Sequence, residues 1–154
     1  LVMLGIKDQE TFPLIFYRDN CADMALVPED INEEYIASSR ALAVTGTHLS
    51  HASTRAAVLK ALEYARRHGL RTALDIDYRP VLWGLTSLGD GETRFIESGP
   101  VTSQLQEVLH LFDLVVGTEE EFHIAGGTTD TIAALRAVRA GGTTHQKNFQ
   151  KISA

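Results

Sequence analysis

The sequence predicts an α/β domain with a mostly parallel sheet and a small separate β lid. An apolar strand at 40–44, an amphipathic helix at 53–68 and a second strand at 71–76 follow one another with short connections. This succession is typical of a right-handed parallel βαβ unit. A helix at 102–110 and a strand at 112–116 repeat the alternation. An aromatic, β-branched stretch precedes these elements and predicts a two-stranded edge flap.

The composition is that of an ordinary globular chain and argues against several classes of function. The 154 residues are 44% hydrophobic and 22% charged, so a packed core is expected rather than disorder. A net charge of −6 without a basic cluster argues against nucleic-acid binding. A single cysteine, Cys21, predicts no internal disulfide and favours a reducing cytoplasm. No apolar run approaches the ~20 residues of a membrane helix, so no membrane binding is expected.

The first part of the chain predicts a two-stranded flap at about residues 12–26. The stretch from Phe12 to Arg18 is aromatic and β-branched, and its Pro13 is typical of an edge strand. Asp19-Asn20 favours a turn, after which residues 23–26 are expected to pair back. A plain edge hairpin without a ligand explains the pattern equally well.

The helix of the βαβ unit is the clearest element of the sequence. Ser53 or Thr54 is the expected N-terminal cap, and Gly69 is the expected stop. Glu63 and Arg67 are four residues apart and should form an ion pair. The apolar face consists of Val58, Leu59, Leu62 and Ala65.

The remaining core elements are shorter. A helix is expected at 28–38, and an irregular stretch with a Gly-Asp-Gly turn at 84–99. The helix at 102–110 should present Val101, Leu105, Val108 and Leu109 to the sheet. A helix at 119–125, stopped by Gly126-Gly127, precedes a last helix at 130–140.

The pattern of a folded domain covers about residues 1–140, with the α/β core at 31–140. Residues 141–154 are polar and aperiodic, although a strand should follow the last helix. We interpret them as a disordered or foreign tail. The chain begins at Leu1 in an apolar run, which we interpret as a sequence entered in mid-strand.

Polar side chains follow three of the predicted parallel strands. The three loops are Thr45 to His48, Asp77 to Arg79 and Gly117 to Glu121. Because the carboxyl ends of such strands share one edge, these loops are the candidate ligand site. In an extended segment Asp75, Asp77 and Arg79 would point the same way. The arginine suits a carboxylate or phosphate, and the acids suit hydrated Mg²⁺.

Each of these features also has an explanation without a ligand. Acids at 119–121 suit the start of a helix. Asp75 could hydrogen-bond backbone at the strand end, and Arg79 could form a surface ion pair. His48 and His51 lack a third ligand, so zinc is not expected. The sequence has no Gly-x-Ser-x-Gly elbow, Walker-type loop or Gly-x-Gly-x-x-Gly motif.

Three segments in order carry a resemblance to a known family: Phe16 to Ala22, Asp75 to Trp83 and Gly117 to Glu121. They resemble the ribokinase-like (phosphofructokinase-B-type) sugar kinases, and within them the branch acting on keto-deoxy sugar acids. The similarity runs from about Leu1 to Ala140, the middle of such a kinase. It implies a three-layer α/β/α fold with a β lid, incomplete here. It also implies ATP and Mg²⁺ as cofactors, a sugar acid as substrate, and leaves a homo-oligomer open.

The resemblance implies roles for individual residues. The substrate-binding positions are Phe16, Arg18, Thr47 and Arg79. The nucleotide-binding positions are Asp77, Tyr78, Arg79 and Thr118, and Glu121 is the metal-binding position. Phe16 stands where relatives often have Tyr, and Thr118 replaces the Asn of the family's Asn-x-x-Glu motif.

One departure from the family bears on activity. Relatives carry a Gly-Ala-Gly-Asp loop with the anion hole and the general base, and this sequence contains none. We therefore expect a central fragment of a sugar-acid kinase, without a catalytic base and inactive alone. Two alternatives remain open: a non-catalytic sugar-acid-binding or interaction module, and an unrelated doubly wound enzyme that holds a metal on Asp75 and Asp77.

Overall fold

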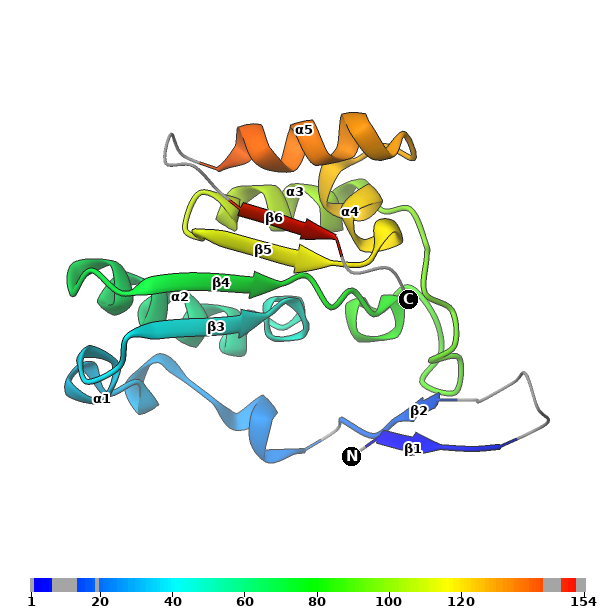
Figure 1. The fold of residues 1–154 in the computed structure, drawn as a ribbon. Helices are drawn as coiled ribbons and strands as arrows, with labels where there is room; N and C mark the ends of the chain where they lie inside the picture. The colour runs from blue at the N-terminus through cyan, green and yellow to red at the C-terminus, as the bar shows by residue number, and fades with distance from the viewer. Residues whose placement is uncertain (1, 7–13, 19, 143–147, 152–154) are drawn as a thin grey trace.

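The computed structural model describes residues 2–6, 14–18, 20–142 and 148–151 (Figure 1). Four parallel strands form one sheet, and a two-stranded antiparallel hairpin lies apart from it near the N-terminus. The expected α/β class with a mostly parallel sheet and a small β lid is confirmed. No helix among these residues is both long and apolar enough to cross a membrane.

The parallel sheet brings three strand ends to one edge. Its strands, in spatial order, are β3 (Ala41–Thr45), β4 (Arg71–Asp75), β5 (Leu114–Gly117) and β6 (Asn148–Lys151). Thr45 lies beside Asp75, and Asp75 lies beside Val116. The strand ends predicted to share an edge therefore do so.

The fourth strand corrects the expectation that no folded element follows residue 140. Helix α5 (Thr131–Gly141) extends to Gly141, and β6 pairs in parallel with β5 through the register Val115 to Phe149. An edge strand is held by backbone hydrogen bonds, which require no apolar alternation in the sequence. The polar composition of this segment therefore concealed its pairing.

Helix α2 (Ala52–Arg67) connects β3 to β4 and lies behind the sheet in Figure 1. Its buried face is Thr54, Ala57, Val58, Ala61, Leu62 and Ala65. The predicted Glu63–Arg67 ion pair is present, with a distance of 2.7 Å between Oε1 and Nη2. Gly69 follows the helix with a φ of +70°, in the left-handed region that favours glycine.

The expected cap of α2 is wrong. His51 is the N-cap residue, without a side-chain cap hydrogen bond. The Ser53 hydroxyl donates to the Leu26 carbonyl at 3.0 Å, and the Thr54 hydroxyl donates to the His48 carbonyl at 2.8 Å. Both hydroxyls therefore tie the start of the helix to preceding loops instead of capping it.

The remaining helices lie where the sequence predicted helices, but their bounds differ from the predicted ones. They are the 3₁₀ helix η2 (Pro28–Asp30), α1 (Glu33–Ala37), α3 (Gly99–Leu109), α4 (Glu119–Gly126) and α5. The helix expected at 28–38 is split, because Asn32 is extended and caps α1 by accepting from the Tyr35 N–H at 2.8 Å. The predicted α3 face of Val101, Leu105, Val108 and Leu109 is fully buried.

The lid hairpin has a different partner strand from the one expected. Strand β2 (Leu14–Phe16) pairs antiparallel with β1 (Val2–Leu4). Residues 22–25 form the 3₁₀ helix η1 (Ala22–Ala25) instead of a return strand. The chain turns at Asn20, whose φ is +52°, and the Met24 N–H then donates to the Cys21 carbonyl at 3.0 Å, which closes a helical turn. Phe12 and Pro13 lie outside the described residues.

Candidate functional site

Two 3₁₀ helices shape the edge where the strands end. Helix η3 (Gly46–Ser50) follows β3, and η4 (Pro80–Trp83) follows the loop after β4. Gly46 begins η3 so close to the end of β4 that an added Cβ would lie 2.0 Å from the Ile76 carbonyl oxygen. The two loops are therefore packed against each other at one rim.

Arg79 lies at this rim, but the strand does not deliver it in the way we expected. β4 ends at Asp75, and Asp77 has a φ of +36°, so the extended alternation stops before it. Aspartate tolerates this left-handed conformation better than most residues. The turn nevertheless brings the groups together: Arg79 Nη2 lies 2.9 Å from Asp77 Oδ1, and Nη1 donates to the Tyr78 carbonyl at 3.3 Å.

Glu121 joins the loop after β4 to the start of α4. Its Oε1 accepts from the Tyr78 backbone N–H at 3.1 Å, and its Oε2 accepts from the Thr118 N–H at 2.8 Å. Thr118 accepts from the Glu121 N–H in return, which completes a capping box. Arg79 Nη1 lies 3.7 Å from the same carboxylate. The positions expected to bind nucleotide and metal are thus gathered in one cluster.

Burial perturbs the acids of this cluster. Glu121 is only 6% exposed, and burial raises its pKa above the usual value, although the Thr118 N–H and Arg79 oppose the rise. Burial and the neighbouring charge of Asp77 likewise raise the pKa of Asp75, against a hydrogen bond from the Asp77 backbone. This hydrogen bond to the backbone at the end of the strand is the explanation without a ligand that the sequence offered for Asp75.

A pocket of about 280 Å³ opens beside this cluster. Its lining residues are Tyr78, Arg79, Arg94, Thr118, Glu120 and Glu121. Burial raises the pKa of Tyr78 to about 12, and its hydroxyl donates to the Ile96 carbonyl at 2.7 Å. Arg94 was missed, because it lies in an irregular stretch without periodicity and no motif marks it.

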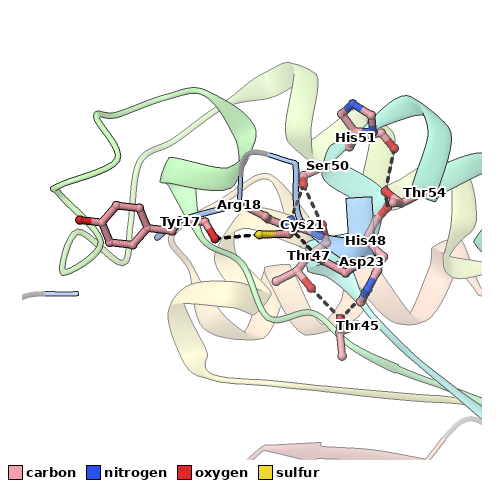
Figure 2. Close-up of polar contacts among 10 residues, drawn as sticks. All are labelled: Tyr17, Arg18, Cys21, Asp23, Thr45, Thr47, His48, Ser50, His51 and Thr54. Atoms are coloured by element: carbon pink, nitrogen blue, oxygen red, sulfur yellow. Dashed lines mark hydrogen bonds and ion pairs between the residues drawn. The ribbon is translucent and has the colours of Figure 1, made fainter. Parts of the chain in front are cut away.

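Arg18 and Thr47 form a second cluster, between the lid and η3 (Figure 2). Arg18 Nε donates to Asp23 Oδ2 at 2.8 Å, and Nη1 donates to the Thr47 carbonyl at 3.0 Å. The hydrogen bond from Arg18 lowers the pKa of Asp23. The Thr47 hydroxyl is hydrogen-bonded to Thr45 at 2.7 Å, and the Thr45 hydroxyl to His48 Nδ1 at 3.0 Å.

Phe16, the other expected lid contact, belongs to neither cluster. It is 9% exposed, and an added Cβ on Gly91 would lie 2.7 Å from its Cε2. The backbone of Gly91 also donates to the Leu14 carbonyl at 3.0 Å. Tyr17 is 49% exposed and its ring points away from Arg18 (Figure 2). Phe16 therefore packs the lid against the loop at 84–99.

The donor set admits a magnesium ion only in a hydrated form. Among the described residues, no group of three or more His, Cys, Asp or Glu side chains is placed to hold a metal. Both oxygens of Glu121 accept backbone N–H groups, and each keeps a lone pair. Mg²⁺ usually retains several waters and one or two carboxylate ligands. Glu121 fits that mode, but a direct metal site on Asp75 and Asp77 gains no support.

Solved structures share the fold of this chain. The match to a PfkB protein from Polaromonas sp. JS666 covers 90% of this chain and 43% of the PfkB protein's chain, with a TM-score of 0.71 and 24% sequence identity. The match to a putative ribokinase II from E. coli, in complex with ATP and Mg²⁺, covers 92% of this chain and 41% of that chain, with a TM-score of 0.70 and 18% sequence identity. The fold of the chain is therefore similar to part of the fold of these two proteins.

Two curated relatives are similar to this chain in sequence. A 5-dehydro-2-deoxygluconokinase from Bacillus anthracis (strain CDC 684 / NRRL 3495) is 37% identical over 122 residues, which are 79% of this chain and 33% of the relative. The same-named protein from Bacillus subtilis (strain 168) is 33% identical over 129 residues, 84% of this chain and 36% of the relative. No family profile matches. The chain spans about a third of these relatives, and it is similar in sequence to part of proteins named 5-dehydro-2-deoxygluconokinase and in fold to part of a PfkB protein.

Proposed function

We propose that this chain forms the rim of an ATP-dependent kinase that phosphorylates 5-dehydro-2-deoxy-D-gluconate or a similar keto-deoxy sugar acid. From the resemblance to kinases of keto-deoxy sugar acids, we also propose that the kinase acts in inositol catabolism in the cytoplasm. The observation that carries the proposal is the pocket beside Arg79, at the carboxyl ends of parallel strands, in a chain similar to proteins named 5-dehydro-2-deoxygluconokinase. Ligands of open α/β sheets bind at this edge.

The residues of the rim have distinct roles in this proposal. Arg18 and Arg79 bind the anionic groups of sugar acid and nucleotide, since guanidinium groups pair with carboxylates and phosphates. Asp77 holds Arg79 from one side, and Thr118 with Glu121 fixes the loop that faces the nucleotide. Bound ATP would supply the phosphoryl group, and hydrated Mg²⁺ beside Glu121 would neutralise its charge.

Phosphoryl transfer in this proposal needs residues that the chain lacks. The sequence contains no Gly-Ala-Gly-Asp segment, which by the resemblance would carry the base and the anion hole. We therefore propose that the chain alone binds substrate but transfers no phosphoryl group.

A non-catalytic sugar-acid-binding module is the second candidate. The Arg18 cluster favours it, because hydrogen bonds to Asp23, Thr47 and Ser50 orient this arginine. Such a module would bind sugar acid without nucleotide, whereas the kinase reading expects MgATP to strengthen the binding.

The test has two parts. Calorimetry measures the binding of 5-dehydro-2-deoxy-D-gluconate to the chain with and without MgATP. A chimera, in which the chain replaces the matching third of the Bacillus subtilis relative, is assayed for sugar-dependent ADP formation. Arg79→Ala should reduce kcat/KM of the chimera by about tenfold or more, since it removes charge-assisted hydrogen bonds.

Arg71→Ala is the matched control, because Arg71 is 82% exposed at the opposite end of the same strand. An active chimera supports the kinase, and binding without activity in the chimera supports the module. Equal activity of the Arg79→Ala and Arg71→Ala chimeras would refute the assigned role of Arg79. Absence of both binding and activity would contradict both candidates.

A further inference from the structure

Arg18 is held by two of its three guanidinium nitrogens. Nε donates to Asp23 Oδ2 at 2.8 Å, while Nη1 donates to the Thr47 carbonyl at 3.0 Å and to Ser50 Oγ at 3.5 Å. Its side chain is 15% exposed. Within the described part of the chain, Nη2 makes no hydrogen bond. The two N–H groups of Nη2 are therefore the ones left for a ligand.

The acceptor on the η3 side is itself fixed. The Thr47 carbonyl also accepts from the Ser50 hydroxyl at 2.7 Å, within the same 3₁₀ helix (Figure 2). Asp23, the acceptor of Nε, lies on η1, five residues after Arg18. The guanidinium group is thus held by acceptors from η1 and η3.

We propose that Asp23 is a positioning residue, which holds Arg18 by Nε so that Nη2 faces the carboxylate of the sugar acid. This inference rests on the proposed function and extends it to a residue outside the expected site. A clamped arginine loses little side-chain freedom when a ligand binds, which strengthens binding. Asp23 is 43% exposed, so the ion pair adds little to stability. Its removal should therefore affect binding more than folding.

The test uses the full 154-residue chain. Asp23→Asn removes the charged acceptor, and Asp23→Glu retains it. Glu29→Gln makes the same change of charge at an exposed site and serves as the control. The readouts are the thermal midpoint, the affinity for 5-dehydro-2-deoxy-D-gluconate by calorimetry, and solvent exchange of the Arg18 Nε–H by NMR, assigned by its loss in Arg18→Lys.

We expect Asp23→Asn to speed exchange of the Arg18 Nε–H and to weaken binding about tenfold, the usual effect of losing a charge-assisted hydrogen bond. Asp23→Glu should recover part of the affinity, and the thermal midpoint should change little. Unchanged affinity or unchanged exchange in Asp23→Asn would overturn the positioning role while leaving the proposed function standing. A wild-type chain and chimera that both fail to bind the sugar acid would refute the proposed function, and the carboxylate role of Arg18 with it.

Discussion

Replacing Glu121 with alanine should destabilise the chain by about 3 kcal/mol without any ligand present. The substitution leaves two backbone donors without their acceptor, the N–H groups of Tyr78 and Thr118. An unsatisfied buried donor costs about 1–3 kcal/mol, and the Tyr78 N–H is buried. Loss of the capping contact at the half-buried Thr118 adds about 1 kcal/mol.

The measurement is urea denaturation at neutral pH, followed by circular dichroism. Glu121→Gln keeps the size and one acceptor oxygen, so it should lose about half as much free energy of unfolding. Glu120→Ala is the matched control, since Glu120 is the exposed neighbour in the same helical turn, and should change stability by less than about 0.5 kcal/mol. A loss below about 1 kcal/mol in Glu121→Ala would refute the structural role of this carboxylate.

Two further outcomes are expected from the same denaturation experiments. Gly46→Ala should lower the free energy of unfolding by about 3 kcal/mol, because its Cβ would lie 2.0 Å from the Ile76 carbonyl oxygen. Gly89→Ala meets nothing within 4 Å and should be nearly neutral; equal losses would contradict the close packing. The pKa of Glu121 in the folded chain is raised above 4.5, the usual value of glutamate, so the folded chain keeps the Glu121 carboxyl proton to higher pH than the unfolded chain does. The difference in free energy of unfolding between wild type and Glu121→Ala should therefore shrink as pH rises from 4.5. A difference that grows over this range would reverse the assigned direction.

The parts of the fold that sequence predicted well are those fixed by apolar periodicity. The buried faces of α2 and α3 follow from a 3.6-residue repeat, and the stop at Gly69 follows from its left-handed φ of +70°. The alternation of strands and helices then implied a parallel sheet, and with it a shared edge. Local chemistry was sufficient for these elements.

Tertiary contacts decided the rest. Ser53 and Thr54 are good caps by residue type, but the Leu26 carbonyl accepts from the Ser53 hydroxyl and the His48 carbonyl accepts from the Thr54 hydroxyl. The partner of β2 could not be told from sequence, since Val2–Leu4 and residues 23–26 are both short and partly apolar. The turn at Asp77 broke the alternation on which its predicted orientation depended.

The two arginines of the rim are held differently, and this bears on what each can bind. Arg79 gives Nη2 to Asp77 and has Glu121 at 3.7 Å, so acids already compensate its charge. An anionic ligand must compete with Asp77 for that nitrogen. Arg18 instead gives Nε to Asp23 and Nη1 to the neutral Thr47 carbonyl, and among the described residues its Nη2 makes no hydrogen bond. If the proposed function holds, a carboxylate would meet no competing acid at Nη2 of Arg18, whereas Arg79 would bind best a group whose negative charge increases during transfer.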